Sequence, residues 1–343
     1  MAANICLGRT KRVGAFLCSL ILVYLIADYF KTEDDIEMGA SNEAKLKSDY
    51  VTGERISSFA DVAIYEISYA HQFPNTSRHA KHLIFLDDEL LEQSESRKIV
   101  LQSQIFFTRV DWLQYFVDKV LPLIQRDFVL VTHMSDMLAG RHEVLLNHEK
   151  LVKWYGCNME PSRKTAALPL GLENPGMWDR TDFNHIYKTR RRHKTRLLYT
   201  HFTIDTNTEK RTSALHALEQ RGFSTSAERL SWNEYISQLG EYKFCACPEG
   251  NGIDTHRLWE CMYLGVVPVV VKVPQMYSWY ASLPILWVDS FEQVTKEFLL
   301  AQYPRLKQEK PLEALDNAAS IRALRLRVTS ELDYQRIWTE LSL

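Results

Sequence analysis

The residues with the most evident chemistry lie in one segment, 244–271, which reads FCACPEGNGIDTHRLWECMYLGVVPVVV. Its apolar start predicts a buried strand that ends at Pro248. Gly250 and Gly252 follow in a short polar stretch, and paired glycines let a backbone loop come close to another molecule. A helical pattern and a second apolar run come next, so the segment predicts a strand, a glycine loop, a helix and a strand.

Asp254 is a suitable N-cap for this helix, which we expect to begin near Thr255 and to end at Gly265. The amino end of a helix presents free N–H groups that bind anions. His256 and Arg257 lie in the first turn, where a helix prefers carboxylates for its own stability. A ligand that carries phosphate therefore explains the basic residues better than helix stability does.

Arg257 and Glu260 are three residues apart and share one face of the predicted helix. In one interpretation Arg257 contacts a diphosphate and Glu260 accepts hydrogen bonds from ribose hydroxyls. In the other, the two side chains form an exposed ion pair and bind nothing. The glycine loop and the buried strand after the helix favour the nucleotide site. The candidate donor-binding residues are Arg211, Glu249, Gly250, Gly252, Asp254, His256, Arg257 and Glu260.

The rest of the chain predicts the elements that position these residues. Apolar runs typical of buried strands lie at 128–131, 166–170, 196–199, 242–247, 266–271 and 285–288. Helix-like stretches lie at 112–125, 142–155, 209–221 and 291–301, and capping boxes begin at Ser231 and Ser290. This alternation predicts parallel sheets covered by helices. The basic stretch 188–196 interrupts the pattern and indicates a junction between two α/β halves.

The segment 248–271, with Arg257, Glu260, Gly265 and Pro268, resembles the donor-binding motif of exostosin-like glycosyltransferases and, more loosely, the corresponding stretch of fucosyltransferases. Weaker resemblances lie at 129–136, 169–174 and 194–203. The resemblance implies a GT-B-like α/β fold, in which two Rossmann-like domains face each other and the C-terminal one holds the nucleotide sugar. It also implies that no metal is required. The stretch EGNGIDTH before Arg257 departs from the family pattern, which indicates an outlying member.

Sugar transfer from a diphosphate needs positive charge at the leaving group, and an inverting enzyme also needs a base for the acceptor hydroxyl. The candidate bases are Asp136, Asp111 and His133, each expected near the carboxyl end of a strand in the first half. Ordinary structural roles are open for them as well: Asp136 as a helix cap, and His133 as a hydrogen-bonded loop residue.

The N-terminus predicts a membrane anchor. Residues 13–30 (VGAFLCSLILVYLIADYF) form an apolar run with one charge, Asp28. A helix of this length just crosses a thin bilayer core. Basic residues (GRTKR) precede the run and acidic residues (EDD) follow it, which predicts a cytosolic N-terminus and a lumenal remainder in the Golgi or ER. A cleaved signal peptide is the alternative, but the run ends in a poor cleavage site.

This topology gives a provisional division of the chain. We expect a cytosolic tail at 1–12, the anchor at 13–30 and a polar stem at 31–58. An acceptor-side α/β domain is expected at 59–192, and a nucleotide-sugar-binding domain at 193–343. The C-terminal helix of the second domain is placed to pack back on the first.

Composition limits the remaining possibilities. The 41 basic and 43 acidic residues nearly cancel, which argues against a dedicated nucleic-acid-binding protein. Asn75 begins an Asn-Thr-Ser glycosylation sequon. Four cysteines follow the anchor, and either a disulfide or buried free thiols would suit them. These are Cys157, Cys245, Cys247 and Cys261. With His256 the last three offer metal ligands, but their spacing matches no closed zinc module, so no metal site is predicted.

Together these features predict a glycosyltransferase. It would move a sugar from a UDP- or GDP-linked donor to a hydroxyl of a glycan or glycoprotein, with inversion and without a cofactor or metal. Two alternatives stay open. Asp87 and Asp88 follow an apolar run and mimic the acidic motif of metal-dependent GT-A transferases. A membrane-tethered protein that binds a glycan or a partner without catalysis also fits the sequence.

Overall fold

The computed structural model describes residues 50–66, 80–174, 182–224, 230–307, 324 and 326–332. The predicted anchor at 13–30, most of the predicted stem and Asn75 lie outside these residues. Within the described part of the chain, no helix combines the length and the apolar character needed to cross a bilayer.

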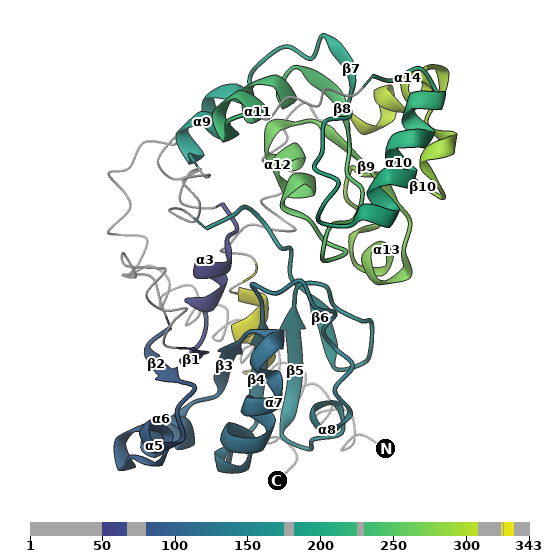
Figure 1. The fold of residues 1–343 in the computed structure, drawn as a ribbon. Helices are drawn as coiled ribbons and strands as arrows, with labels where there is room; N and C mark the ends of the chain where they lie inside the picture. Colours follow the sequence, from purple (N-terminus) through teal and green to yellow (C-terminus); the bar gives the residue numbers. More distant parts are fainter. Residues whose placement is uncertain are drawn as a thin grey trace, which may run out of the picture. The chain divides into compact units, whose positions relative to one another are not determined.

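The first half of the described chain forms a six-stranded parallel sheet in the order β2-β1-β3-β4-β5-β6 (Figure 1). Its strands are β1 (Val62–Tyr65), β2 (His82–Phe85), β3 (Ile105–Thr108), β4 (Phe128–Thr132), β5 (Leu151–Gly156) and β6 (Thr165–Ala167). Its helical elements are α3 (Gly53–Ser57), α5 (Asp88–Glu92), α6 (Ser94–Gln102), η1 (Val110–Trp112), α7 (Leu113–Tyr115), η2 (Phe116–Val120), η3 (Leu121–Leu123) and α8 (Glu143–Leu146). Every residue of β3 and β4 is buried, as expected for strands covered on both faces.

The second half forms a four-stranded parallel sheet in the order β10-β9-β8-β7. Its strands are β7 (Arg196–Tyr199), β8 (Tyr242–Ala246), β9 (Val267–Val271) and β10 (Leu286–Val288). Its helical elements are α9 (Phe183–Thr189), α10 (Thr208–Gln220), α11 (Trp232–Leu239), α12 (His256–Leu264), α13 (Pro274–Tyr280), η4 (Phe291–Gln293) and α14 (Lys296–Leu306). The prediction of two parallel α/β halves is confirmed by these two sheets.

Strand register brings functional candidates to the same edge of each sheet. In the first sheet Thr132 at the end of β4 lies opposite both Thr108 of β3 and Gly156 of β5. The residues that follow β4 and β5 therefore leave the sheet side by side. In the second sheet Tyr199, the last residue of β7, lies opposite Cys245 of β8.

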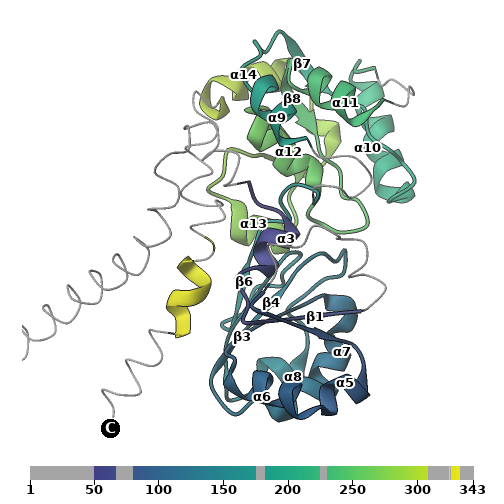
Figure 2. The ribbon, with the colours of Figure 1, turned by 90° about the vertical axis from the view of Figure 1, so that its left-hand side faces the viewer.

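Each sheet has its own hydrophobic core. Phe107, Val129 and Val131 belong to the core of the first sheet, and Phe244 and Val267 to that of the second. The C-terminal segment returns to the first half, because its Leu324 and Val328 belong to the first core and Tyr155 donates a hydrogen bond to the Arg327 carbonyl at 3.2 Å. Figure 2 shows this segment as a yellow helix beside the strands of the first half.

The junction between the halves lies earlier than the basic stretch 188–196. Helix α9 packs against α11 and α12 of the second half. Its His185 contacts the Asn233 carbonyl and the Ser237 hydroxyl of α11. These contacts place α9 with the second half, before the predicted boundary at residue 192. The basic residues are no linker: Lys194 donates to the Gly240 and Leu264 carbonyls, at the ends of α11 and α12.

The last residues of the predicted stem, 50–58, lie inside the fold. Tyr50, Val51 and Thr52 are almost fully buried. The Val51 amide donates to the Tyr263 hydroxyl at 2.9 Å, and Thr52 forms a bridge with Leu172. Residues 50–58 are polar enough in sequence to suggest an exposed segment, but tertiary contacts hold them inside the fold.

Helix prediction succeeded at the capping box of α11 and failed for the stretches 142–155 and 291–301. The Ser231 capping box at α11 is confirmed, with both reciprocal bonds to Glu234 present. The stretch 142–155 is not one helix but α8 followed by β5, which is buried between β4 and β6. The stretch 291–301 begins as a short 3-10 turn, and α14 starts only at Lys296, where the Thr295 side chain caps it.

Candidate functional site

The predicted strand, loop, helix and strand are present as β8, the 247–255 loop, α12 and β9. Helix α12 ends at Gly265, whose φ of 68° is left-handed and suits glycine. Helix α12 begins one residue later than expected, because Thr255 is the N-cap and no side chain caps the helix. Its amino end therefore keeps unsatisfied N–H groups, as the sequence predicted.

Asp254 does not cap α12. It is 2% exposed, and its two carboxylate oxygens accept hydrogen bonds from the Leu170 amide and the Trp259 indole, both at 2.8 Å. Its own amide donates to the Asn158 side chain at 2.8 Å. Burial raises the pKa of Asp254 to about 6, against the opposing effect of these hydrogen bonds. Asp254 therefore joins the loop to the first half and offers a ligand no free oxygen.

The glycine loop admits the protein's own side chains. A Cβ atom on Gly252 would lie 2.8 Å from the Asn158 amide nitrogen, and one on Gly250 would lie 3.0 Å from the Arg211 guanidinium. Arg211 also donates to the Glu249 carbonyl at 2.9 Å and to the Thr203 carbonyl. The two glycines therefore give the Asn158 and Arg211 side chains close approach to the loop, and Arg211 holds the loop in place. Access for a phosphate stays a prediction.

His256 faces the first half of the chain. Its Nδ1 lies 2.8 Å from the Gly171 carbonyl oxygen, and its Nε2 lies 3.4 Å from a carboxylate oxygen of Glu173. These contacts hold His256 against the segment that follows β6.

Arg257 is the candidate with an incomplete set of partners. Its guanidinium is half-buried, lies 5.1 Å from the centroid of the Tyr235 ring, and has Nη1 3.9 Å from the Cys245 sulfur. No carboxylate of a described residue lies within 4.0 Å of it. A guanidinium is always charged in proteins, so Arg257 is able to bind a further anion.

Glu260 is not the ion-pair partner of Arg257. It is 7% exposed and accepts a short hydrogen bond from the Tyr235 hydroxyl at 2.6 Å. The alternative of an exposed ion pair is therefore wrong. Glu260 instead fixes Tyr235, whose ring faces Arg257, and any effect of Glu260 on a ligand would act through that contact.

Tyr199 adds a second unsatisfied group at the same place. It is 2% exposed, and its hydroxyl has no hydrogen-bond partner. Burial raises its pKa, while the charge of Arg257 acts in the opposite direction. Its ring lies 5.9 Å from that of Tyr235. We call Arg257, Tyr199, Tyr235 and Glu260 the Arg257 site. It lies at the carboxyl ends of β7 and β8, the edge where open α/β sheets bind ligands.

A cavity of about 480 Å³ lies beside the glycine loop, a volume typical of small-molecule pockets. Its lining residues are Asp136, Met137, Leu138, Asn158, Lys210, Glu249, Asn251, Ile253, Val273 and Gln275. The cavity brings the candidate base Asp136 together with the donor candidate Glu249. The Glu249 carboxylate forms a close ion pair with Lys210. Arg257 does not line this cavity, so the predicted residues fall into two groups.

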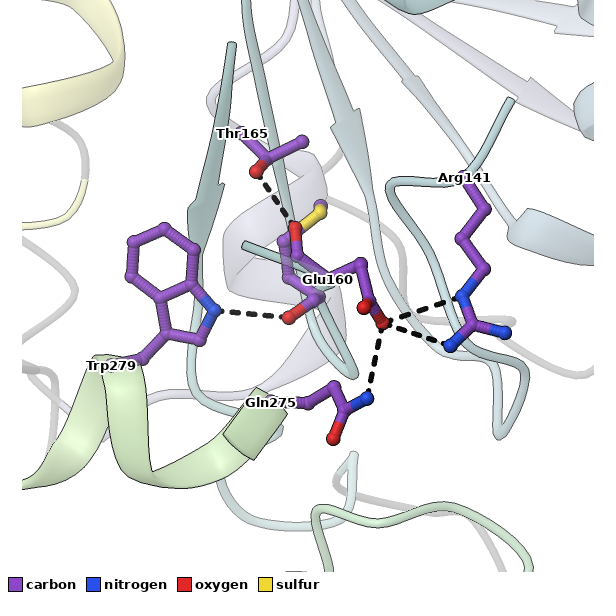
Figure 3. A network of polar contacts seen from close by, with 6 residues as sticks. Arg141, Glu160, Thr165, Gln275 and Trp279 are labelled. Atoms are coloured by element: carbon purple, nitrogen blue, oxygen red, sulfur yellow. Dashed lines mark hydrogen bonds and ion pairs between the residues drawn. The ribbon is translucent and has the colours of Figure 1, made fainter. Parts of the chain in front are cut away.

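The side wall of this cavity is fixed by α13. Gln275 donates to the Glu160 carboxylate at 3.2 Å, and Arg141 forms an ion pair with the same carboxylate at 3.1 Å (Figure 3). The Trp279 indole donates to the Met159 carbonyl at 3.0 Å. Trp279 thus holds α13 on the segment after β5.

The three candidate bases differ in access. Asp136 is exposed and lines the cavity. Asp111 forms an ion pair with Arg109 at 3.1 Å. His133 is 1% exposed, its Nε2 contacts the Pro169 carbonyl at 3.0 Å, and burial lowers its pKa to about 4. An acceptor hydroxyl therefore has access to Asp136 but not to His133.

The acidic pair of the metal-dependent alternative is already engaged. Asp87 accepts a hydrogen bond from the Glu89 amide at 2.9 Å, and Asp88 forms an ion pair with Lys119 at 2.5 Å. Both follow β2, the edge strand of the sheet. The Asp87 and Asp88 carboxylates therefore stabilise the start of α5.

Three residues of these sites were not predicted. Tyr199 lies at the end of β7 and Tyr235 in α11, so both approach Arg257 from other elements. In the sequence, only their positions at a strand end and after a helix cap could have drawn attention to them. Asn158 follows β5, a strand that the sequence did not reveal.

No protein family model matches this chain, and no curated protein matches it. Among solved structures, the chain is similar to a crystal structure of an alpha1,3-fucosyltransferase with GDP-fucose, at a TM-score of 0.42 and 10% sequence identity. The match covers 79% of this chain and 89% of that one. A similarity of this size does not define a fold, which here follows from the strand order and register of the chain itself.

Proposed function

We propose that this protein is a glycosyltransferase that uses a nucleotide-sugar donor. The observation that carries the proposal is a half-buried Arg257 without a carboxylate partner, close to a buried Tyr199 hydroxyl without a hydrogen-bond partner. A diphosphate is dianionic and rich in acceptor oxygens, so it satisfies both groups at once. The Tyr235 ring, held by Glu260, supplies an aromatic surface next to it.

The proposed chemistry uses both the Arg257 site and the cavity beside the glycine loop. Arg257 and Tyr199 stabilise the charge that develops on the leaving diphosphate. Asp136 takes the proton from the acceptor hydroxyl in the adjacent cavity, which leads to inversion at the sugar carbon. Glu249, Asn251 and Ile253 line that cavity, and Arg257 follows them closely in the sequence. The loop that carries them therefore connects the proposed donor and acceptor positions.

The wider assignment is part of the same proposal. The two parallel α/β halves suit a GT-B arrangement with the donor on the second half and no requirement for Mg²⁺ or Mn²⁺. The acceptor is a hydroxyl of a glycan or glycoprotein. The apolar run at 13–30 anchors the chain in a Golgi or ER membrane with the two halves in the lumen. The exostosin-like resemblance stays a prediction.

A thermal-shift panel with UDP-, GDP- and CMP-sugars tests the proposal. One nucleotide class should raise the melting temperature, because a ligand at 100 times its Kd stabilises the folded state by about 2.7 kcal/mol. The shift should vanish in Arg257→Ala. Stabilisation without turnover would favour the non-catalytic alternative. Stabilisation only in the presence of Mg²⁺ or Mn²⁺ would favour the metal-dependent one, and no shift with any nucleotide would refute the donor site.

Asp136→Asn should lower kcat by about 10²–10⁴-fold, the usual contribution of a general base, while donor binding stays unchanged. The side chain is exposed, so the fold should tolerate the change. Initial rates at saturating donor and acceptor measure the effect, and Asp127→Ala, an exposed aspartate outside the cavity, is the matched control. Wild-type kcat in Asp136→Asn would exclude it as the base.

A further inference from the structure

Three thiols converge between β8 and α12. Cys245 lies in β8, and Cys247 follows one residue past the end of that strand. The Cys247 amide still donates to the Val269 carbonyl of β9, so the strand-like alternation continues and both side chains point to the same face of the sheet. Cys261 of α12 packs against that face. The three sulfur atoms all lie within 4.8 Å of one another, and those of Cys247 and Cys261 are 3.9 Å apart. All three residues are at most 3% exposed.

This spacing suits a shared metal ion. Zinc–thiolate bonds are about 2.3 Å long, so sulfur atoms in a tetrahedral zinc site lie about 3.8 Å apart. The thiols otherwise make only long contacts: Cys245 with the Ala246 carbonyl and Cys247 with the Cys245 carbonyl, both at 3.5 Å. Buried thiols that serve only as apolar filling do not need to gather in a group of three.

The charge next to the cluster also favours metal binding. Metal ions bind thiolates, and a neighbouring cation promotes the loss of the thiol proton. The Arg257 guanidinium lies 3.9 Å from the Cys245 sulfur.

We propose that Cys245, Cys247 and Cys261 bind one thiophilic d¹⁰ cation of the Zn²⁺ class. Three sulfur–metal bonds form, three thiol protons leave to solvent, and no electrons are transferred. No fourth His, Cys, Asp or Glu joins the cluster among the described residues, so the remaining position takes a water molecule. The ion braces β8 against α12. Thiolates discriminate against Mg²⁺ and Mn²⁺, so this site is compatible with sugar transfer that needs neither ion.

Cadmium titration of the full chain tests the proposal. The protein is reduced with a phosphine, freed of metal and titrated with Cd²⁺, and the thiolate-to-cadmium absorption band is followed. We expect one Cd²⁺ per chain. Cys261→Ser should weaken binding by more than about 100-fold, beyond the usual effect of losing an outer-shell partner. Cys157→Ser is the matched control, because Cys157 is a fully buried thiol that contacts the Ser135 carbonyl instead of the cluster.

Thermal unfolding provides a second readout that does not depend on enzymatic activity. Zn²⁺ should raise the melting temperature of wild type and of Cys157→Ser, but not that of Cys261→Ser or Cys261→Ala, whose folding circular dichroism checks. The proposal is overturned if wild type binds no stoichiometric Cd²⁺, or if Cys157→Ser loses binding equally. Isolation of the protein with a disulfide between two of the three cysteines, despite Zn²⁺ in the buffer, would also overturn it.

Discussion

Arg257→Ala should lower kcat/KM for the nucleotide-sugar donor by on the order of 10²–10³-fold, the range seen when one group that stabilises developing negative charge is removed. Arg257 has no carboxylate to leave unpaired, so the variant should fold. Calorimetric donor binding and initial rates measure the effect.

Two further variants make this result specific. Arg257→Lys keeps the charge but loses the planar, bidentate donor geometry, so we expect an intermediate loss. Arg192→Ala removes an exposed arginine that pairs with Glu241 at 3.1 Å, and it should leave kcat/KM unchanged. A folded Arg257→Ala protein with wild-type kinetics would show that the diphosphate is not bound at this site.

Among the variants considered, Asp254→Ala should lower the free energy of unfolding most, by roughly 2–5 kcal/mol at pH 5. The substitution leaves two buried hydrogen-bond donors without an acceptor. These donors are the Leu170 amide and the Trp259 indole. Urea denaturation measures the free energy of unfolding. Asp127→Ala, whose side chain is exposed, should change stability by less than about 0.5 kcal/mol. A comparable change in both variants would mean that Asp254 does not join the halves.

The pH dependence of this loss has a definite sign. The pKa of Asp254 is raised from 3.8 to about 6 in the folded protein, so the folded state binds the proton more tightly than the unfolded state. The stability that this raised pKa contributes is fully present below about pH 4 and is lost as the pH rises through 6. The loss in the free energy of unfolding is at most about 3 kcal/mol. The stability difference between wild type and Asp254→Asn should therefore shrink from pH 4 to pH 7. A constant difference would contradict the raised pKa.

The second half was more predictable than the first. The runs that became β7, β8, β9 and β10 are apolar and bounded by polar or glycine residues, which is sufficient to indicate buried parallel strands. Strands β1 (VAIY) and β3 (IFFT) are as apolar as these runs but were not predicted, and β5 (LVKWYG) is interrupted by a lysine. The residues of β5 fit a helical pattern together with those of α8, and only pairing with β4 and β6 decides that they are a strand.

The candidate site was predictable only in part. Arg257 was identified because a cation is out of place in the first turn of a helix, and that reasoning needs no tertiary information. The glycines indicate that another group comes close to the loop, but the sequence does not show that Asn158 and Arg211 do so. Asp254 was expected to cap α12 but accepts a hydrogen bond from the Leu170 amide. Leu170 is 84 residues away in the chain, so the sequence does not reveal this contact.

The buried segment 50–57 has a practical consequence for anyone who expresses this protein without its apolar N-terminus. A fragment that starts at residue 59 would lose the Val51 amide that binds Tyr263 of α12, and with it the Tyr50 ring that packs 4.7 Å from Tyr263. Such a truncation would expose the opposite end of the helix that carries Arg257. A truncated protein intended for crystallisation or enzymology should therefore begin upstream of Tyr50.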